Sequence, residues 1–546
     1  MALAIASGVP SQHGLYTAIV AGGLIAALGG SRVQVSCPTA AFVVILAPIS
    51  AKFGTGGLLL ATLMAGAILL VFALGRMARW IEFIPYPVTT GFTAGIAVVI
   101  TTLQLKDFLG LDIAKMPDHF IERVAALAGA LPTPSIWDCG VGALTLAVLI
   151  LLPRLTRRIP APIVALPLAA IAGAALLQMV PSAHLSTIGN RFSYSADGRM
   201  HAGIPQLPPL PGLPWEMAGP DGAPLGLSLE LLRALLGPAF AIAMLGAIES
   251  LLSAVVSDGM TGRKHDPDAE LLAQGIGNVV APFFGGFAAT GAIARTATNV
   301  RSGARSPIAA IVHAVFILAA VLVLAPALGY LPMAALAALL LIVAWNMCEA
   351  KHFIYVLKVA PKSDVTVLLI CFGLTVLFDM VVAVSAGVIL AAVLFMRRMA
   401  EVSGIKLVGD GHPALDLPLP GGVVLYEIAG PLFFGAAQKA MSALQTIQKG
   451  VRCVVLDLNG VPAIDATGLV NLESTLARLR QMNVFVILAG VQPQPGRVLA
   501  KAGNRDEPSR LAIRESFDDA VALARAYAAV TADPAAATTD LGQRAS

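Results

Sequence analysis

The sequence predicts an α-helical membrane domain of about fourteen spans, followed by a small soluble α/β domain. The first observation is composition, because 57% of the 546 residues are hydrophobic and only 12% are charged. A soluble domain is about one quarter charged. The second is that apolar runs long enough to cross a bilayer recur up to about residue 398. The third is a change to short strands and helices after about residue 405.

The expected spans are of two kinds. Residues 58–74, 163–180, 308–328 and 381–396 form clear apolar runs, whereas other spans are shorter or are broken by Gly and Pro. They lie within a transmembrane domain of residues 1–400. In order along the chain, we expect spans near residues 1–9, 14–29, 38–52, 56–74, 88–105, 136–152, 163–180, 230–257, 271–287, 290–302, 308–328, 332–347, 364–378 and 380–398.

Basic residues in the connections predict the orientation. The connection after each even-numbered span carries Arg or Lys, for example Arg79, Arg263 and Arg398. The positive-inside rule places these ends, and the C-terminus, in the cytoplasm. We therefore expect a multi-pass protein of the cell inner (plasma) membrane. The net charge of +4 is spread along the loops and does not predict binding to nucleic acid.

Three further segments complete the domain organisation. Residues 183–228 are rich in Pro and Gly, so we expect a long outer loop without helix or strand interiors. Residues 420–528 form the soluble domain, in which we expect strands at 423–428, 451–458 and 484–488 and a helix at 469–479. Residues 529–546 are rich in Ala, Thr and Asp, a composition that predicts a disordered tail.

Two breaks at membrane depth predict an anion site. Residues 33–42 read as an extended stretch with a helix starting near Pro38, and residues 285–296 as a glycine-rich stretch with a helix starting around Thr290. A helix that starts in mid-membrane presents unpaired N–H groups and a positive dipole end, so two such starts can hold an anion. The breaks fall in the third and tenth spans, an offset that predicts a seven-plus-seven inverted repeat. The alternative is a pair of kinks packed against neighbouring helices.

Two charged residues favour the anion site. Arg295 lies close to the second helix start, where it could attract an anion or could pair with a structural carboxylate; we favour the first. Glu249 lies within an apolar span and shares a helix face with Gly246, Ser253 and Ser257. It could carry a coupling proton. A salt bridge to Arg295 or a packing hydrogen bond is the alternative, and the serines could equally serve helix packing.

Four stretches of the sequence resemble the SulP anion permease family (the sulfate permease or solute-carrier sulfate transporter family). The resemblance covers nearly the whole chain, and includes the STAS domain that follows the transporters of this family. The matching stretches are residues 8–16 (GVPSQHGLY), 36–42 (SCPTAAF), 274–278 with 284–286 and 290–296 (QGIGN, FGG and TGAIART), and 430–435 with 464–469 (GPLFFG and IDATGL).

The resemblance implies a fourteen-span inverted repeat split into core and gate domains, homodimers, and an elevator-type movement of the core. It implies substrates such as sulfate, bicarbonate, chloride or dicarboxylates. The cation-coupling position maps onto Glu249, where an acidic residue suits proton symport more than anion exchange. The implied substrate-binding residues are Thr39, Ala40, Ala41, Phe42, Ala294 and Arg295.

The chain departs from the family pattern in three places. Cys37 stands where glycine is usual, and Ala288 stands where proline is usual. The chain also starts only nine residues before Pro10, so we expect the N-terminal half of the first span, with one substrate contact, to be absent. Leu3 lies where a further contact would fall.

The STAS-like segment resembles anti-sigma-factor antagonists, in which a Ser or Thr of an Asp-x-[Ser/Thr]-Gly loop can be phosphorylated. Thr467 holds that position and is the candidate regulatory residue, in a domain that could bind a cytoplasmic partner. The alternative is that Thr467 only caps the following helix. Asp465 is expected to be a loop or cap residue.

The sequence therefore favours proton-coupled transport of an anion. A sodium-coupled bicarbonate symporter, a nucleobase permease and a transport-inactive, membrane-anchored signalling protein are the alternatives. We expect no enzyme activity and no cofactor or metal, since the sequence shows no nucleophile–base pair, phosphate loop or metal cluster. Five cysteines without paired or metal-like spacing read as small hydrophobic residues.

Overall fold

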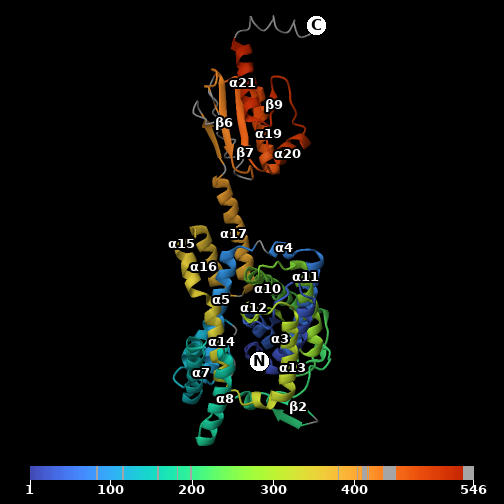
Figure 1. Cartoon of the computed structure of the whole chain (residues 1–546), viewed down its shortest axis with the longest axis vertical. Coiled ribbons are helices and arrows are strands. Elements are labelled where there is room, and N and C mark those ends of the chain that lie inside the picture. Colours follow the sequence, from blue (N-terminus) through green and yellow to red (C-terminus); the bar gives the residue numbers. More distant parts are fainter. Residues whose placement is uncertain are drawn as a thin grey trace. The chain divides into compact units, whose positions relative to one another are not determined.

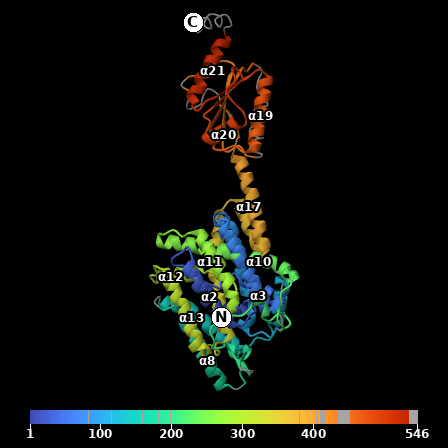
Figure 2. The same cartoon turned by 90° about the vertical axis from the view of Figure 1, so that its right-hand side faces the viewer.

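The chain forms two compact units, Met1–Ala391 and Ala392–Ser546, in a computed structural model (Figures 1 and 2). We refer to them as the membrane unit and the C-terminal unit. The structure describes residues 1–81, 84–113, 116–117, 119–156, 159–180, 182–196, 199–378, 380–402, 404–408, 415, 417–433 and 450–532.

The described part of the membrane unit consists mainly of helices. Two pairs of short strands interrupt them: β1 (Ser36–Cys37) with β4 (Thr290–Gly291), and a hairpin that is described below. The main helices are α1 (Ala2–Ala6), α2 (Ser11–Leu28), α3 (Val43–Leu74), α5 (Tyr86–Leu109), α7 (Ile136–Leu155), α8 (Ala161–Met179), α10 (Leu229–Thr261), α11 (Pro267–Val280), α12 (Ile293–Arg301), α13 (Ile308–Leu328), α14 (Met333–Cys348), α16 (Lys362–Leu377) and α17 (Met380–Val402). Shorter or peripheral helices are α4 (Ala78–Ile81), α6 (Phe120–Ala130), α15 (Ala350–Val359) and the 3-10 turn η2 (Ala281–Phe284).

Each of the fourteen expected spans falls on a helix or on one half of α3. The two halves of α3 meet at Gly54, whose φ of 70° only glycine adopts freely. A Cβ there would lie 2.4 Å from the backbone carbon of Gly219. Among the described residues, eight helical stretches are long and apolar enough to cross a membrane. The remaining expected spans are shorter or more polar, so the number fourteen stays a prediction.

The long helices pack into two groups. In the first helix group, α3 packs against α10 and α11, and α2 packs against α11 and α13. In the second helix group, α5 packs against α14 and α16, and α7 packs against α8 and α14. Figure 1 shows the two groups side by side. Close approach depends on small residues: a Cβ at Gly66 would lie 2.6 Å from the backbone nitrogen of Val279.

Residues 183–228 contain more regular structure than the sequence predicts. They include α9 (Ile188–Arg191), a hairpin of β2 (Ser193–Ala196) and β3 (Arg199–Ala202), and the 3-10 turn η1 (Pro214–Glu216). The expectation of a loop without strands is therefore wrong. The pairing is local: a capping box at Thr187 starts α9, and the Tyr194 and His201 rings stack across the hairpin. The later part contains η1 and is otherwise largely irregular.

The C-terminal unit contains a five-stranded sheet in the order β5-β6-β7-β8-β9. β5 (Gly404–Val408) pairs antiparallel with β6 (Val423–Ala429), and the rest, β7 (Cys453–Gly460), β8 (Phe485–Ala489) and β9 (Leu511–Ile513), run parallel. Its described helices are the end of α17, which continues from the membrane unit, and α19 (Ala466–Gln481), α20 (Pro493–Lys501) and α21 (Phe517–Ala532). Buried residues of α19 and α20 cover one face of the sheet, and those of α21 cover the other.

The sequence locates three of these strands and one helix to within about three residues. β5, β9, α20 and α21 were missed. The last helix also corrects the expected tail boundary, because α21 continues to Ala532, into the segment 529–546. Residues 533–546 lie outside the described residues.

Candidate anion-binding site

Two chain segments that are far apart in sequence cross at the centre of the first helix group. β1 and β4 pair antiparallel, with Ser36 opposite Gly291 and Cys37 opposite Thr290. The amide of Ala292 extends the pairing by donating to the Val35 carbonyl oxygen at 2.9 Å. Because the strands are antiparallel, the chain leaves them in opposite directions, and α3 and α12 start on either side of the crossing.

Close packing at this crossing requires a glycine. A Cβ at Gly291 would lie 2.2 Å from Nε2 of Gln34 and 3.1 Å from the Cα of Ser250. The side chain of Thr290 donates to the Gly246 carbonyl oxygen of α10 at 2.7 Å. The crossing is thereby fixed to α10, the helix that carries Glu249.

The first helix start lies later in the chain than predicted. α3 begins at Val43 rather than near Pro38, because residues 40–42 form a turn in which the Val43 amide bonds to the Ala40 carbonyl oxygen at 3.1 Å. Among the described residues, the amides of Ala40, Ala41 and Phe42 have no hydrogen-bond acceptor. Since the positive end of the helix dipole lies here as well, the turn offers donors to an anion.

The second helix start is similar. α12 begins at Ile293, three residues after the predicted Thr290, with Ala292 as its N-cap and no side-chain cap. In an α-helix the first amides lack an intrahelical acceptor, and the first ladder bond here is that of Thr296 to the Ala292 carbonyl oxygen at 2.8 Å. The amides of Ile293, Ala294 and Arg295 therefore face the same need for an acceptor as those of the first start.

The two charged residues of the site differ in burial and in partners. Arg295 lies in the first turn of α12 with an exposed side chain, and the described residues contain no carboxylate paired with it. Glu249 is half-buried on α10 and accepts a hydrogen bond from Thr39 Oγ1 at 2.6 Å. A salt bridge between Glu249 and Arg295, one alternative drawn from the sequence, is absent from the described structure.

The other predicted substrate-binding residues differ in what they can offer. Thr39 is half-buried, Ala294 is exposed, and Ala40 and Ala41 are buried. The side chain of Phe42 is 1% exposed and packs toward Gly246 of α10. Phe42 can therefore present its amide to an anion, whereas its ring serves the packing of α3 on α10.

The sequence did not predict Glu270, a buried carboxylate next to the crossing. Glu270 of α11 is 1% exposed. Its oxygens accept hydrogen bonds from Gln34 Nε2 (2.7 Å), Ser250 Oγ (3.0 Å), Gln274 Nε2 (3.2 Å) and the Ser31 amide (3.2 Å). This network joins α10 and α11 to the segment before β1.

A sequence signal for Glu270 did exist. Asp266 and Pro267 form an N-cap and first helical residue, and Asp266 accepts bonds from the amides of Asp268 and Ala269. They place the helix start before Glu270, whereas the expected span began at residue 271. The serines of α10 belong to the same polar packing: Ser253 Oγ lies 3.2 Å from Thr296 Oγ1, and Ser257 Oγ lies 3.3 Å from Ser31 Oγ. This supports the packing interpretation of these serines.

Comparison with known proteins identifies the family. The family model described as the sulfate permease family matches residues 1–371, and the STAS domain model matches residues 414–520. The chain belongs to the sulfate permease family. Its recognition from the four sequence stretches is thus confirmed, as is the helical membrane fold with a C-terminal STAS domain.

Relatives of this permease include transporters from several bacteria. "Putative sulfate transporter YvdB" of Bacillus subtilis is 38% identical over 92% of this chain and 90% of its own length. "Bicarbonate transporter BicA" of a Picosynechococcus species is 28% identical over 92% of this chain and 87% of its own length. Both the sulfate and the bicarbonate names thus occur among similar proteins.

Solved structures support the fold. The murine anion transporter Slc26a9 in an inward-facing state superimposes with a TM-score of 0.82 over 96% of this permease and 88% of that chain, at 18% identity. The transmembrane domain of the cyanobacterial bicarbonate transporter BicA gives a TM-score of 0.58 over 72% of this permease and 92% of that chain, at 26% identity. The first likeness concerns the fold alone.

The STAS domain of this permease corrects one interpretation of Thr467. The N-cap of α19 is Asp465, whose Oδ1 accepts a hydrogen bond from the Gly468 amide at 2.7 Å. Thr467 is the second residue of the helix, and its side chain is exposed. Thr467 is therefore not the cap, and the cap assignment for Asp465 is confirmed. Phosphorylation of Thr467 stays a prediction.

Proposed function

We propose that this permease is a secondary active transporter that couples anion movement to protons, with sulfate, bicarbonate or a dicarboxylate as substrate. The observation that carries the proposal is that positive groups and one acidic residue lie near each other at the crossing. The unpaired Arg295 and the two helix starts offer a positive site, while Glu249 lies beside it and bonds to Thr39 at 2.6 Å. An anion can therefore bind next to a carboxylate that exchanges a proton.

The proposed substrate contacts are the amides of the two helix starts and the Arg295 guanidinium. A planar or tetrahedral oxyanion accepts hydrogen bonds from several donors at once. The contributing residues are Thr39, Ala40, Ala41, Phe42, Ala294 and Arg295. Glu249 is the proposed coupling residue.

For the movement, we propose that the first helix group slides as one body against the second. Both helix starts, β1, β4 and the Glu270 network belong to the first helix group. The hydrogen bonds between these segments are numerous and buried, so the site would keep its geometry while the first helix group moves. A homodimer, an inner-membrane location and a cytoplasmic C-terminal unit that binds a regulatory partner are part of the same proposal.

The experiment is uptake of labelled sulfate, bicarbonate, fumarate and succinate by purified protein in liposomes, with and without an inward proton gradient. We expect Arg295→Ala to lower uptake about tenfold or more, the loss of one charge-assisted contact. Glu249→Gln keeps an oxygen for Thr39 but cannot release a proton, so its uptake should no longer respond to the gradient.

Two matched variants serve as controls. Glu230→Gln changes an exposed glutamate in the first turn of the same helix, and Arg305→Ala changes an exposed arginine outside the site. Both should transport as the unmodified protein does. Equal loss of uptake in Arg305→Ala and Arg295→Ala would contradict the role of Arg295.

A sodium-coupled bicarbonate symporter is the second candidate. It is favoured by the likeness to the bicarbonate transporter BicA and by the hydroxyl and carboxylate oxygens that meet at Thr39 and Glu249. Bicarbonate uptake that requires sodium at fixed pH would select this candidate. Absence of uptake of every labelled anion would favour a transport-inactive signalling protein.

A further inference from the structure

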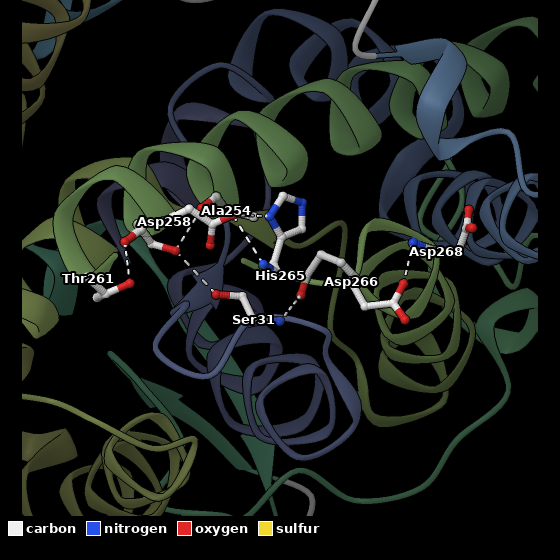
Figure 3. A network of polar contacts seen from close by, with 9 residues as sticks. Ser31, Ala254, Asp258, Thr261, His265, Asp266 and Asp268 are labelled. Atoms are coloured by element: carbon white, nitrogen blue, oxygen red, sulfur yellow. Dashed lines mark hydrogen bonds and ion pairs between the residues drawn. The ribbon is translucent and has the colours of Figure 1, made fainter. Parts of the chain in front are cut away.

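A cavity of about 350 Å³ lies at one end of α10, away from the helix starts. It opens between the loop of residues 30–33, which leads into β1, and the last turn of α10 with the loop that follows it. Figure 3 shows Ser31, Asp258 and His265 of these segments. Its volume is at the lower end of the range for small-molecule sites. The lining residues are Gly30, Ser31, Arg32, Val33, Ser257, Asp258, Thr261, Arg263, Lys264 and His265.

Three of the lining side chains are basic and unpaired. Arg32, Arg263 and Lys264 are exposed, and none of them forms an ion pair or side-chain hydrogen bond with another described residue. They come from two separate loops, yet they line one cavity. Their combined positive charge favours an anion and disfavours a metal cation.

A buried histidine supplies a second, independent observation. The His265 side chain is 5% exposed, and its Nδ1 lies 2.7 Å from Asp258 Oδ2 (Figure 3). The His265 amide donates to the same oxygen at 3.1 Å. The ring atom Nε2 has no hydrogen-bond partner among the described residues. A buried polar atom without a partner is costly, so Nε2 favours a ligand at this cavity.

Asp258 does not oppose an anion here. One of its oxygens bonds to both the ring and the amide of His265. With Nδ1 held at this carboxylate, Nε2 is the ring atom that is left for a ligand.

We propose that this cavity binds a phosphate-like oxyanion, at a site separate from the transport site. His265 Nε2 would hydrogen-bond to it from the buried side, and Arg32, Arg263 and Lys264 would neutralise it from the open side. By the orientation proposed above, the cavity faces the cytoplasm. The oxyanion is either a free inorganic ion or the headgroup of an anionic lipid.

The cavity is connected to the crossing. Ser31 lines the cavity, its amide donates to Glu270 at 3.2 Å, and its hydroxyl lies 3.3 Å from that of Ser257. Residues 31–36 then continue directly into β1. A bound oxyanion would therefore hold the loop that leads into β1. Because β1 is one strand of the crossing, the cavity would act as a regulatory site.

The test measures binding and does not depend on transport. The full chain is purified in detergent, and its melting temperature is followed as inorganic phosphate is added, with chloride at equal ionic strength as reference. We expect phosphate to raise the melting temperature. In Arg263→Gln/Lys264→Gln, the concentration that gives half of the effect should increase about tenfold or more.

Two controls make the outcome specific. Arg305→Gln removes an exposed basic residue outside the cavity and should behave as the unmodified protein does. Arg295→Ala should also retain the phosphate effect, since the transport site is separate. If Arg305→Gln weakens the phosphate effect on the melting temperature as much as the double variant does, the effect is general screening of charge. If Arg295→Ala removes the phosphate effect, phosphate acts at the transport site. Either result overturns the proposal.

A lipid arm distinguishes the two sources. The same variants are placed in nanodiscs of phosphatidylcholine alone or with phosphatidylglycerol. If the headgroup is the ligand, phosphatidylglycerol raises the melting temperature of the unmodified protein but not of the double variant, and phosphate adds little. If the free ion is the ligand, only phosphate acts. Absence of any shift from phosphate and from phosphatidylglycerol overturns the proposal.

Discussion

At the scale of single residues, the crossing of β1 and β4 depends on the lack of a side chain at Gly291 and on the hydrogen bonds of Gln34. Gly291 leaves room for Gln34, which in turn bonds to Ser250 and Glu270 at 2.8 and 2.7 Å. These contacts join three separate parts of the sequence. Substitutions here should therefore affect folding before they affect transport.

Gly291→Ala is expected to destabilise the membrane unit. The added Cβ would lie 2.2 Å from Gln34 Nε2, and backbone of α10 closes the other side, so overpacking should cost roughly 1–3 kcal/mol or more. The melting temperature in detergent and the yield of monodisperse protein measure this. Gly129→Ala, where a Cβ meets nothing within 4 Å, is the control and should not be destabilising.

Glu270→Gln is also expected to destabilise the membrane unit. The carboxylate oxygens accept four hydrogen bonds from Gln34, Ser250, Gln274 and the Ser31 amide. An amide at this position would turn its NH₂ group toward at least one of these donors, and a buried donor would lose its acceptor, at a cost of about 1–3 kcal/mol. We expect a lower melting temperature for Glu270→Gln than for Glu230→Gln. Equal melting temperatures would mean that the network carries no stability.

At the scale of elements, the edge strand β9 depends on an ion pair. Arg514 Nη1 lies 2.6 Å from Asp506 Oδ2, and the Ile513 amide donates to Asp506 Oδ1 at 2.8 Å. The hydrogen bond from Arg514 lowers the pKa of the Asp506 carboxyl, and the Ile513 bond lowers it further. The folded state therefore favours the charged carboxylate.

The lowered pKa of Asp506 makes the stability of β9 depend on pH. The stabilisation is present above the unfolded pKa of about 3.9 and is lost as the pH falls through the lower folded pKa. Asp506→Asn should increase hydrogen exchange of β9 amides at pH 7, and the difference from the unmodified protein should close below about pH 4. Because the pair is partly exposed, its contribution is at most about 1 kcal/mol. Glu515→Gln, an exposed neighbour, is the control; equal exchange in Asp506→Asn and unmodified protein at pH 7 would rule out the effect.

At the scale of the whole molecule, the orientation in the membrane can be tested by labelling. The positive-inside rule places the connection at Arg305 inside and that at Gly129 outside. In a background without native cysteines, a membrane-impermeant maleimide should label Gly129→Cys in intact cells. Arg305→Cys should react only after the membrane is opened. The reverse pattern would invert the proposed topology and place the cavity lined by Arg32, Arg263 and His265 outside the cell.

The sequence alone determined the positions of the long apolar helices and the family. Apolar runs are local features, since each residue's preference for lipid does not depend on its neighbours in space. All fourteen expected spans accordingly fall on a helix or on half of α3, and the strands β6, β7 and β8 appear where predicted. Arg295 and Glu249 were also identifiable, because isolated charges in apolar runs are conspicuous.

The tertiary structure decided what the sequence could not. The pairing of Cys37 with Thr290 joins segments far apart in the chain, and no local preference encodes such a pairing. The burial of Glu270 depends on Gln34, which lies on another segment. The start of α3 at Val43 and the separation of Arg295 from Glu249 follow from the same crossing. Hydrophobicity fixes which residues enter the membrane, whereas long-range hydrogen bonds fix how they meet.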